Sequence, residues 1–141
     1  MNKINPIIND IRIALGLKDD NGTIVKTSTI PDAGSGLFAK IKFRVGDFID
    51  FYTGTIIYDI NELPRDNAYL FHNIEGNFYI DGKFGNSIRY INHNDSELCN
   101  CAYKYYMLPD INILYPIVIC IKDVEVGEEL FCDYGKYYTF F

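Results

Sequence analysis

Two short segments carry the residues best suited to chemistry. Asn92 and His93 stand side by side, and Asp133, Tyr134 and Gly135 follow much later in the chain. Amide, imidazole and phenol groups can hold a polar ligand or orient a reacting nitrogen. Each segment also has a structural interpretation, because Asn-His is a common turn dipeptide and a buried tyrosine often bonds to backbone. A general base at His93 is conceivable, but the sequence pairs no Ser or Cys nucleophile with it.

A glycine-containing segment upstream could approach a ligand. Gly34, Ser35 and Gly36 follow a turn at 30–33. Glycine permits positive φ and a close approach of backbone to a ligand. The same Gly-x-Gly is equally typical of a tight hairpin, and it lacks the further glycine and the helix of a dinucleotide-binding fingerprint.

The chain is rich in aromatic residues, with 12 Tyr and 10 Phe. Aromatic walls exclude water yet tolerate positive charge, so they suit a channel for a lysine side chain. Most of these rings are expected to be core. Tyr52 and Tyr69 illustrate the ambiguity, because by strand alternation alone either could face the core or a channel.

Four motifs, taken together and in order, resemble the SET domain family of lysine methyltransferases. They lie at residues 34–39 (Gly-Ser-Gly-Leu-Phe-Ala), 52–54 (Tyr-Thr-Gly), 85–93 (ending Arg-Tyr-Ile-Asn-His) and 128–135 (Glu-Glu-Leu-Phe-Cys-Asp-Tyr-Gly). The resemblance covers about residues 24 to 138. It implies a mainly β, SET-type fold of small curled β-sheets around a knot-like core, with a short N-terminal helix added.

The resemblance also implies a role for each matched residue. Tyr134 and Tyr52 are the implied catalytic residues, with the Tyr134 hydroxyl at the reacting centre. The residues implied to bind the cofactor, S-adenosylmethionine, are Ser35, Gly36, Leu37, Arg89, Asn92 and His93. Those implied to line the lysine channel are Tyr69, Phe71 and Cys132. Cys132 stands where the family usually has Phe or Tyr, at a position that limits how many methyl groups fit. A small Cys predicts products beyond monomethyl-lysine, unless a bulkier neighbour narrows the channel.

The segment after His93 departs from the family pattern. The family commonly continues Ser-Cys-x-Pro-Asn-Cys, whereas residues 94–101 are two residues longer, with Asn100 expected to keep the structural role of the family's asparagine. The family's C-terminal zinc-binding cysteine cluster has no counterpart here, and we expect no metal. At best Cys99, Cys101, Cys120 and His93 could serve as zinc ligands, and Cys120 lies in an apolar run typical of core. The aromatic tail at 137–141 could either close the site or pack on the core.

Composition limits the classes of protein. The 141 residues fit one domain, and the apolar runs are too short to span a bilayer. The N-terminus lacks the layout of a secretory signal. A net charge of −6 argues against direct binding of nucleic acid and favours cationic partners such as a lysine-rich peptide. The plainer interpretation, which we favour for an unknown chain, is that mild acidity keeps the protein soluble.

The chain is expected to consist of one helix and many short strands. Asn5 would cap the helix, Pro6 would occupy its first position and Gly16 would end it. Ile7, Ile11 and Leu15 share one face at helical spacing, so that face should dock on the domain. We divide the chain into a helical extension, 1–20, and a SET-like catalytic domain, 21–141. The predicted strands lie at 24–29, 48–52, 55–58, 77–81, 117–121 (buried on both faces) and 130–133.

The sequence therefore predicts an S-adenosylmethionine-dependent protein-lysine N-methyltransferase. The expected substrate is a histone tail or another lysine-rich chromatin protein, with no direct nucleic acid and no membrane as partner. The main alternative is a non-catalytic module whose aromatic channel binds lysine or methyl-lysine peptides; a small zinc module is a weaker one. The many Ile, Asn, Tyr and Lys residues suggest an AT-rich genome, and with the small size they hint at a virus or an intracellular microbe acting on its host. We expect an intracellular protein that acts in a nucleus, either its own or that of a host. A homodimer is left open.

Overall fold

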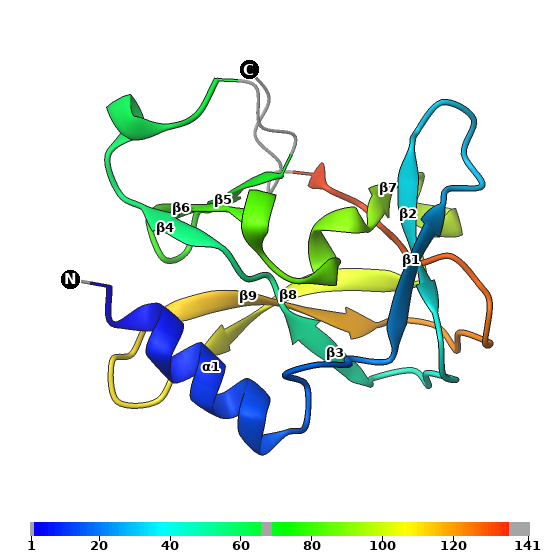
Figure 1. Ribbon diagram of the computed structural model, residues 1–141, viewed down its shortest axis with the longest axis horizontal. Coiled ribbons are helices and arrows are strands. Elements are labelled where there is room, and N and C mark those ends of the chain that lie inside the picture. The colour runs from blue at the N-terminus through cyan, green and yellow to red at the C-terminus, as the bar shows by residue number, and fades with distance from the viewer. Residues whose placement is uncertain (1, 66–68, 136–141) are drawn as a thin grey trace.

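The computed structural model describes residues 2–65 and 69–135, and they form a mainly β structure with one helix (Figure 1). The predicted tail at 137–141 lies outside the described residues. The helix and strands are α1 (Ile4–Ala14), β1 (Thr23–Thr27), β2 (Ser35–Ala39), β3 (Phe48–Phe51), β4 (Thr55–Ile57), β5 (Leu70–Asn73), β6 (Phe78–Asp81), β7 (Asn92–His93), β8 (Cys101–Met107), β9 (Leu114–Cys120) and β10 (Phe131–Cys132). Four short 3-10 turns, η1 (Ile60–Glu62), η2 (Gly82–Phe84), η3 (Ser87–Tyr90) and η4 (Ser96–Leu98), complete the described elements.

The strands form several small sheets, as predicted. β1 and β2 make an antiparallel hairpin, β9 lies between β3 and β8, and β6 lies between β4 and β5. In Figure 1 the β4-β6-β5 sheet lies to the left and the β1-β2 hairpin to the right, with β8 and β9 running between them. β7 and β10 pair in parallel, which joins two segments that are far apart in the sequence.

The central strand β9 shows how the core is filled. Tyr115, Val118 and Cys120 are fully buried, whereas Ile117 and Ile119 are partly buried. Ile121 follows the strand and is 41% exposed, so the prediction that 117–121 is buried on both faces is wrong at its end. Strand β9 ends at Cys120, and the backbone N–H of Ile121 makes one further bond in the same register, to the carbonyl of Asn100 (2.8 Å).

Helix α1 begins two residues earlier than the capping pattern predicts. The side chain of Asn2, not Asn5, accepts hydrogen bonds from the first turn, from the backbone N–H of Ile4 (2.8 Å) and of Asn5 (3.3 Å). Pro6 therefore occupies the third helical position, which is tolerated because the N–H groups of the first turn lack intrahelical partners. Gly16 ends the helix with φ +75°, as predicted.

The buried face of α1 also differs from the predicted one. Ile4 and Ile8 are fully buried in the core, with Ile7 and Ile11 partly buried beside them. Leu15 is 56% exposed, because the helix stops at Ala14 and the chain turns away. The apolar face therefore shifts by about one position around the helix. The boundary between the helical extension, 1–20, and the catalytic domain, 21–141, stays a prediction.

A buried ion pair fixes α1 to the central sheet. The guanidinium of Arg12 donates from Nε to Oδ1 of Asp50 (2.8 Å) and from Nη2 to Oδ2 (2.9 Å). Asp50 lies on β3 and has no exposed surface, and Asn21 donates a further hydrogen bond to it (2.9 Å). Such a bidentate pair is specific in geometry, and losing one partner leaves a charge buried. None of the described helices is long and apolar enough to cross a membrane.

We predict that Arg12→Ala lowers the free energy of unfolding by about 3–5 kcal/mol, because it strands the carboxylate of Asp50 in the core. Denaturant unfolding at neutral pH measures this change. Lys18→Ala, at an exposed position on the following loop, is the matched control and should change stability by less than about 0.5 kcal/mol. Equal effects of the two substitutions would contradict the role given to the ion pair.

Candidate functional site

The two segments that carry the most suggestive chemistry meet in space. β7 and β10 run parallel, with Asn92 opposite Phe131 and His93 opposite Cys132. The backbone N–H of Asn94 continues the contact by donating to the carbonyl of Cys132 (3.3 Å). The predicted cofactor residues on β7 are thus beside the strand that leads into Tyr134.

Tyr134 is held at both its backbone and its hydroxyl. Its hydroxyl donates a hydrogen bond to the carbonyl of Ile91. Its backbone N–H donates to Nδ1 of His93 (2.9 Å), and the two rings lie 5.2 Å apart. Because Nδ1 accepts, neutral His93 carries its proton on Nε2. His93 therefore positions the tyrosine, a contact that does not fit a general base acting through Nδ1.

Asn92 connects β7 to the glycine-containing segment. Its Nδ2 donates to the backbone carbonyl of Ser35 (3.0 Å) and lies 3.4 Å from Oε2 of Glu129. Ser35 is exposed and Gly36 is buried beside it, so three of the residues predicted to bind the cofactor come together here. The side chain of Leu37 is fully buried in the core instead, and its predicted contact with the cofactor stays a prediction.

Glu129 belongs to the matched motif at 128–135, but no role was predicted for it from the sequence. Its carboxylate is nearly buried and accepts from the hydroxyl of Ser28 (2.7 Å) and from the N–H (2.7 Å) and hydroxyl (2.6 Å) of Thr29. Burial alone raises the pKa of Glu129, but the bonds from Thr29, Ser28 and Asn92 outweigh it and lower the pKa below its usual value. The stability that this carboxylate contributes is thus present above its unfolded pKa and lost as the pH falls through the folded one.

Two of the predicted site residues, Tyr52 and Phe71, form a buried aromatic cluster with Tyr103, whereas the ring of Tyr69 lies outside it, 5.8 Å from that of Tyr90. The rings of Tyr52 and Phe71 lie 5.0 Å apart, and Tyr103 packs edge-on against Phe71 (5.0 Å) and against Tyr52 (6.4 Å). The hydroxyl of Tyr52 donates to the carbonyl of Tyr69. Tyr103 was missed, although the alternation along 101–107 places Cys101 and Tyr103 on the same buried face.

Tyr103 also links this cluster to the end of the chain. Burial raises its pKa well above the usual value, and electrostatic interaction with Cys132, Tyr134 and Tyr52 adds to the effect. A tyrosine with a raised pKa stays neutral at physiological pH. Tyr103 therefore adds an uncharged ring to the cluster.

Cys132, on β10, belongs to a group of buried thiols. All four cysteines are free and buried, and the thiol of Cys101 bonds to those of Cys120 and Cys132. The bond with Cys120 lowers the pKa of Cys101, but the bond with Cys132 and burial outweigh it and raise the pKa. Buried thiols of this kind are unreactive. Within residues 2–65 and 69–135, no group of three or more Cys, His, Asp or Glu side chains could hold a metal ion.

The side chain of Arg89 organises its own loop. Nη1 donates to the carbonyls of Gly85 and Asn86, and Nη2 donates to the hydroxyl of Tyr90 (2.9 Å). The guanidinium also lies over the ring of Tyr90 (4.4 Å) and near that of Tyr69 (5.8 Å). Arg89 thereby supports the segment that leads into Asn92, and its predicted contact with the cofactor stays a prediction.

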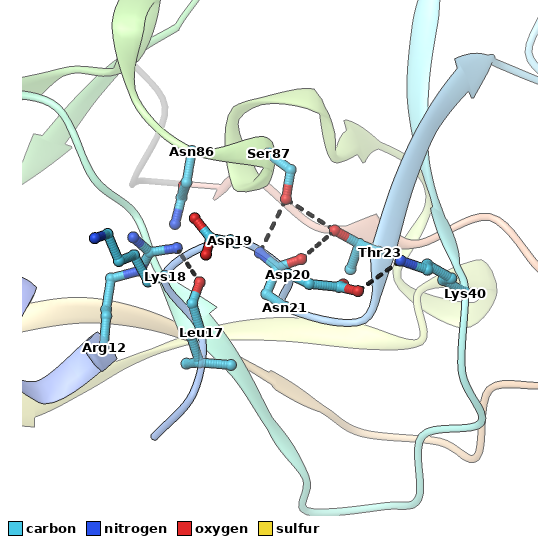
Figure 2. A pocket seen from close by; sticks show the side chains of 10 residues that line it. All are labelled: Arg12, Leu17, Lys18, Asp19, Asp20, Asn21, Thr23, Lys40, Asn86 and Ser87. Atoms are coloured by element: carbon cyan, nitrogen blue, oxygen red, sulfur yellow. Dashed lines mark hydrogen bonds and ion pairs between the residues drawn. The ribbon is translucent and has the colours of Figure 1, made fainter. Parts of the chain in front are cut away.

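A polar cavity of about 280 Å³ lies elsewhere, between the end of α1, the start of β1 and η3. Figure 2 shows that its polar side chains pair with one another: Thr23 with Ser87, and Lys40 with Asp20. The guanidinium of Arg12, at one wall, bonds to the carbonyl of Leu17 (2.9 Å). Because several of its polar groups bond to one another and none of the predicted site residues lines it, we do not interpret this cavity as the site of the chemistry.

Comparison with known proteins agrees with the geometry. The SET domain model matches residues 34–135. The N-lysine methyltransferase KMT5A-A of Xenopus laevis is 30% identical over 125 residues, which cover 79% of this chain and 36% of that protein. The histone-lysine N-methyltransferase EZH2 of Chaetomium thermophilum is 30% identical over 138 residues, covering 87% of this chain and 9% of that protein. The chain thus spans about a third of the first relative's length and a smaller part of the second.

Solved structures agree as well. An autoinhibited ctPRC2 bound to S-adenosylmethionine is 28% identical with a TM-score of 0.72, covering 89% of this chain and 16% of that chain. A humanized mutant of the Chaetomium thermophilum Polycomb Repressive Complex 2 bound to the inhibitor GSK126 is 26% identical with a TM-score of 0.74, covering 95% of this chain and 18% of that chain. The family model matches well over half of the residues, and the chain therefore belongs to the SET domain family.

Proposed function

We propose that the protein is an S-adenosylmethionine-dependent protein-lysine N-methyltransferase. The observation that carries this proposal is the parallel pairing of β7 with β10, which sets Asn92 beside the strand that leads into Tyr134. Related chains of the same family are named lysine methyltransferases, and a solved relative contains S-adenosylmethionine. One segment would hold the methyl donor, and the other would face the acceptor nitrogen.

The residues beside Asn92 suit the cofactor. A carbonyl at Ser35, the backbone of Gly36 and Leu37, and the amide of Asn92 offer polar groups of both kinds at one place. His93 and Arg89 shape the same loop through their contacts with Tyr134 and Tyr90. When bound, S-adenosylmethionine supplies a methyl group on a sulfonium, and the lysine nitrogen takes it as the carbon–sulfur bond breaks.

The aromatic cluster suits the acceptor. A free lysine has a pKa of about 10.4, so its amine must lose a proton before it can attack. An apolar environment lowers that pKa by disfavouring the ammonium form. Tyr52, Phe71 and Tyr103 are buried and uncharged, and Tyr134 is fixed in orientation by its bond to Ile91. Positioning and desolvation would therefore supply the catalysis.

We infer that the substrate is a histone tail or another lysine-rich chromatin protein. The net charge of −6 favours a cationic peptide, and both curated relatives are named for action on lysine, one of them on histones. From such a substrate we infer a nuclear location, either in the protein's own cell or in that of a host. Self-association as a homodimer stays a prediction.

We further infer that the product goes beyond monomethyl-lysine. Cys132 is fully buried on β10, two residues before Tyr134, and its side chain is much smaller than the Phe or Tyr usual in the family. Cys101 lies against it, so small thiols would line the part of the lysine channel next to the reacting nitrogen. Small side chains there leave room for added methyl groups.

A non-catalytic module that binds lysine or methyl-lysine peptides is the second candidate function. The grouping of the rings of Tyr52, Phe71 and Tyr103 favours it, since aromatic rings around a cation attract a quaternary ammonium without any chemistry. A reader of this kind does not need the hydroxyl of Tyr134. Substitution of Tyr134 therefore separates the two functions.

Tyr134→Phe is expected to lower kcat about 100-fold, because it removes one oriented hydroxyl at the reacting centre. The Kd for S-adenosylmethionine should change by less than about 3-fold, since the ring and its backbone bond to His93 remain. Methyl transfer from the labelled cofactor to a histone panel, with calorimetry for cofactor binding, measures both. Tyr58→Phe, at a tyrosine that is 64% exposed, is the control. A wild-type protein that binds peptide but transfers no methyl group would establish the reader instead.

Cys132→Tyr is expected to confine the product to monomethyl-lysine by filling the space beneath the amine. Mass spectrometry of the substrate peptide over time reports the methylation state. The substitution overpacks a buried site at a cost of about 1–3 kcal/mol, so thermal unfolding is measured alongside. Cys99→Ala, at a buried cysteine outside β10, should leave the product distribution unchanged. Monomethyl-lysine as the sole product of the wild-type protein would refute the inference about Cys132.

A further inference from the structure

Glu129 is a buried carboxylate that ties together three segments of the site. The donors to it come from the turn after β1, at Ser28 and Thr29, and from Asn92 on β7. Glu129 directly follows the turn at 125–128, and an isolated backbone bridge to Phe38 fixes its position. A carboxylate this well satisfied is held in one place, and so are the groups that bond to it.

The orientation of the Asn92 amide follows from this arrangement. Its Nδ2 faces two acceptors, the carbonyl of Ser35 and Oε2 of Glu129. Reversing the amide would put Oδ1 against these two oxygens, one of them on an ionised group, which is repulsive. Oδ1 is therefore the atom that Asn92 can offer to a ligand. An amide oxygen accepts hydrogen bonds, so it suits a ligand with an ammonium group.

Gly36 shows how tightly the segments fit around the carboxylate. A Cβ added there would collide with Oε2 of Glu129, closer than real side chains approach. The segment at 35–37 can therefore reach Glu129 because residue 36 is glycine. The pKa of Glu129 is lowered, so the carboxylate stays ionised at neutral pH and the arrangement persists there.

We propose that Glu129 is a positioning residue for the methyl donor. Its carboxylate holds Asn92 so that Oδ1 faces the ammonium group of the amino-acid part of the cofactor. This proposal rests on the proposed function, because it assumes that Asn92 contacts that part of S-adenosylmethionine. The carboxylate acts through Asn92 and takes no part in methyl transfer.

Glu129→Gln tests the proposal, because it keeps the shape and removes the charge. The neutral side chain places an NH₂ group among donors and frees the Asn92 amide to reverse. We expect the Kd for S-adenosylmethionine and for S-adenosylhomocysteine to rise at least about 10-fold, with kcat at saturating cofactor within about 3-fold. Glu128→Gln is the matched control, since Glu128 is exposed and its carboxylate contacts only the backbone of Glu125 among the described bonds.

A second ligand separates positioning from general damage. Methylthioadenosine keeps the adenosine and a thioether, as in S-adenosylhomocysteine, but lacks the amino-acid part and with it the ammonium group. Its Kd should change by less than about 2-fold in Glu129→Gln, because methylthioadenosine has no ammonium group for Oδ1 of Asn92 to bind. An equal fall in affinity for both ligands would overturn the proposal and leave Glu129 a purely structural role.

A milder variant covers the case in which Glu129→Gln does not fold. Ser28→Ala keeps the carboxylate and its bond to Asn92 but removes one donor to the carboxylate. It should raise the Kd for S-adenosylhomocysteine about 2–5-fold and leave the Kd for methylthioadenosine unchanged. Unchanged binding of both ligands would count against the proposal. If the wild-type protein bound neither S-adenosylmethionine nor S-adenosylhomocysteine, the proposed function itself would fail, which is a different result from a loss of selectivity in the variants.

Discussion

The parallel contact between β7 and β10 is the constraint on which the site depends. It joins only two residues of each strand, so its own hydrogen bonds contribute little. Asn100 reinforces it by donating to the carbonyl of Glu129 (2.9 Å) and accepting from the N–H of Phe131 (3.0 Å), which fits the structural role expected for that asparagine. The hydroxyl of Tyr134 adds a further link between the two segments by donating to the carbonyl of Ile91. Side chains, more than backbone, therefore hold the two segments together.

The proposed methyl transfer would rest on this arrangement, because it positions the two reactants. The parts that the proposed reaction requires are a fixed acceptor at Asn92, an uncharged aromatic cluster, and an oriented hydroxyl at Tyr134. Each is produced by packing or by hydrogen bonds between segments. The contacts that stabilise the fold are thus also the contacts that set the geometry of the site.

Much of this could be predicted from local patterns, and the remainder could not for physical reasons. Most strands lie close to where β-branched and aromatic runs place them, and Gly16 ends the helix as expected. The start of the helix was misplaced because the side chains of Asn2 and Asn5 can both accept bonds from a first turn. Glu129 was missed because Ser28 and Thr29 are about a hundred residues away, and no local pattern reports such a contact. Tyr103 was missed because no strand was predicted at 101–107, so the alternation that buries this residue was not considered.

A crystal structure with S-adenosylhomocysteine and a lysine peptide would test the central claim most directly. The account predicts the amino group of the cofactor product within hydrogen-bond distance of Oδ1 of Asn92 and the lysine tip beside the hydroxyl of Tyr134. A cofactor product bound instead in the polar cavity of Figure 2, or a lysine remote from Tyr134, would contradict it.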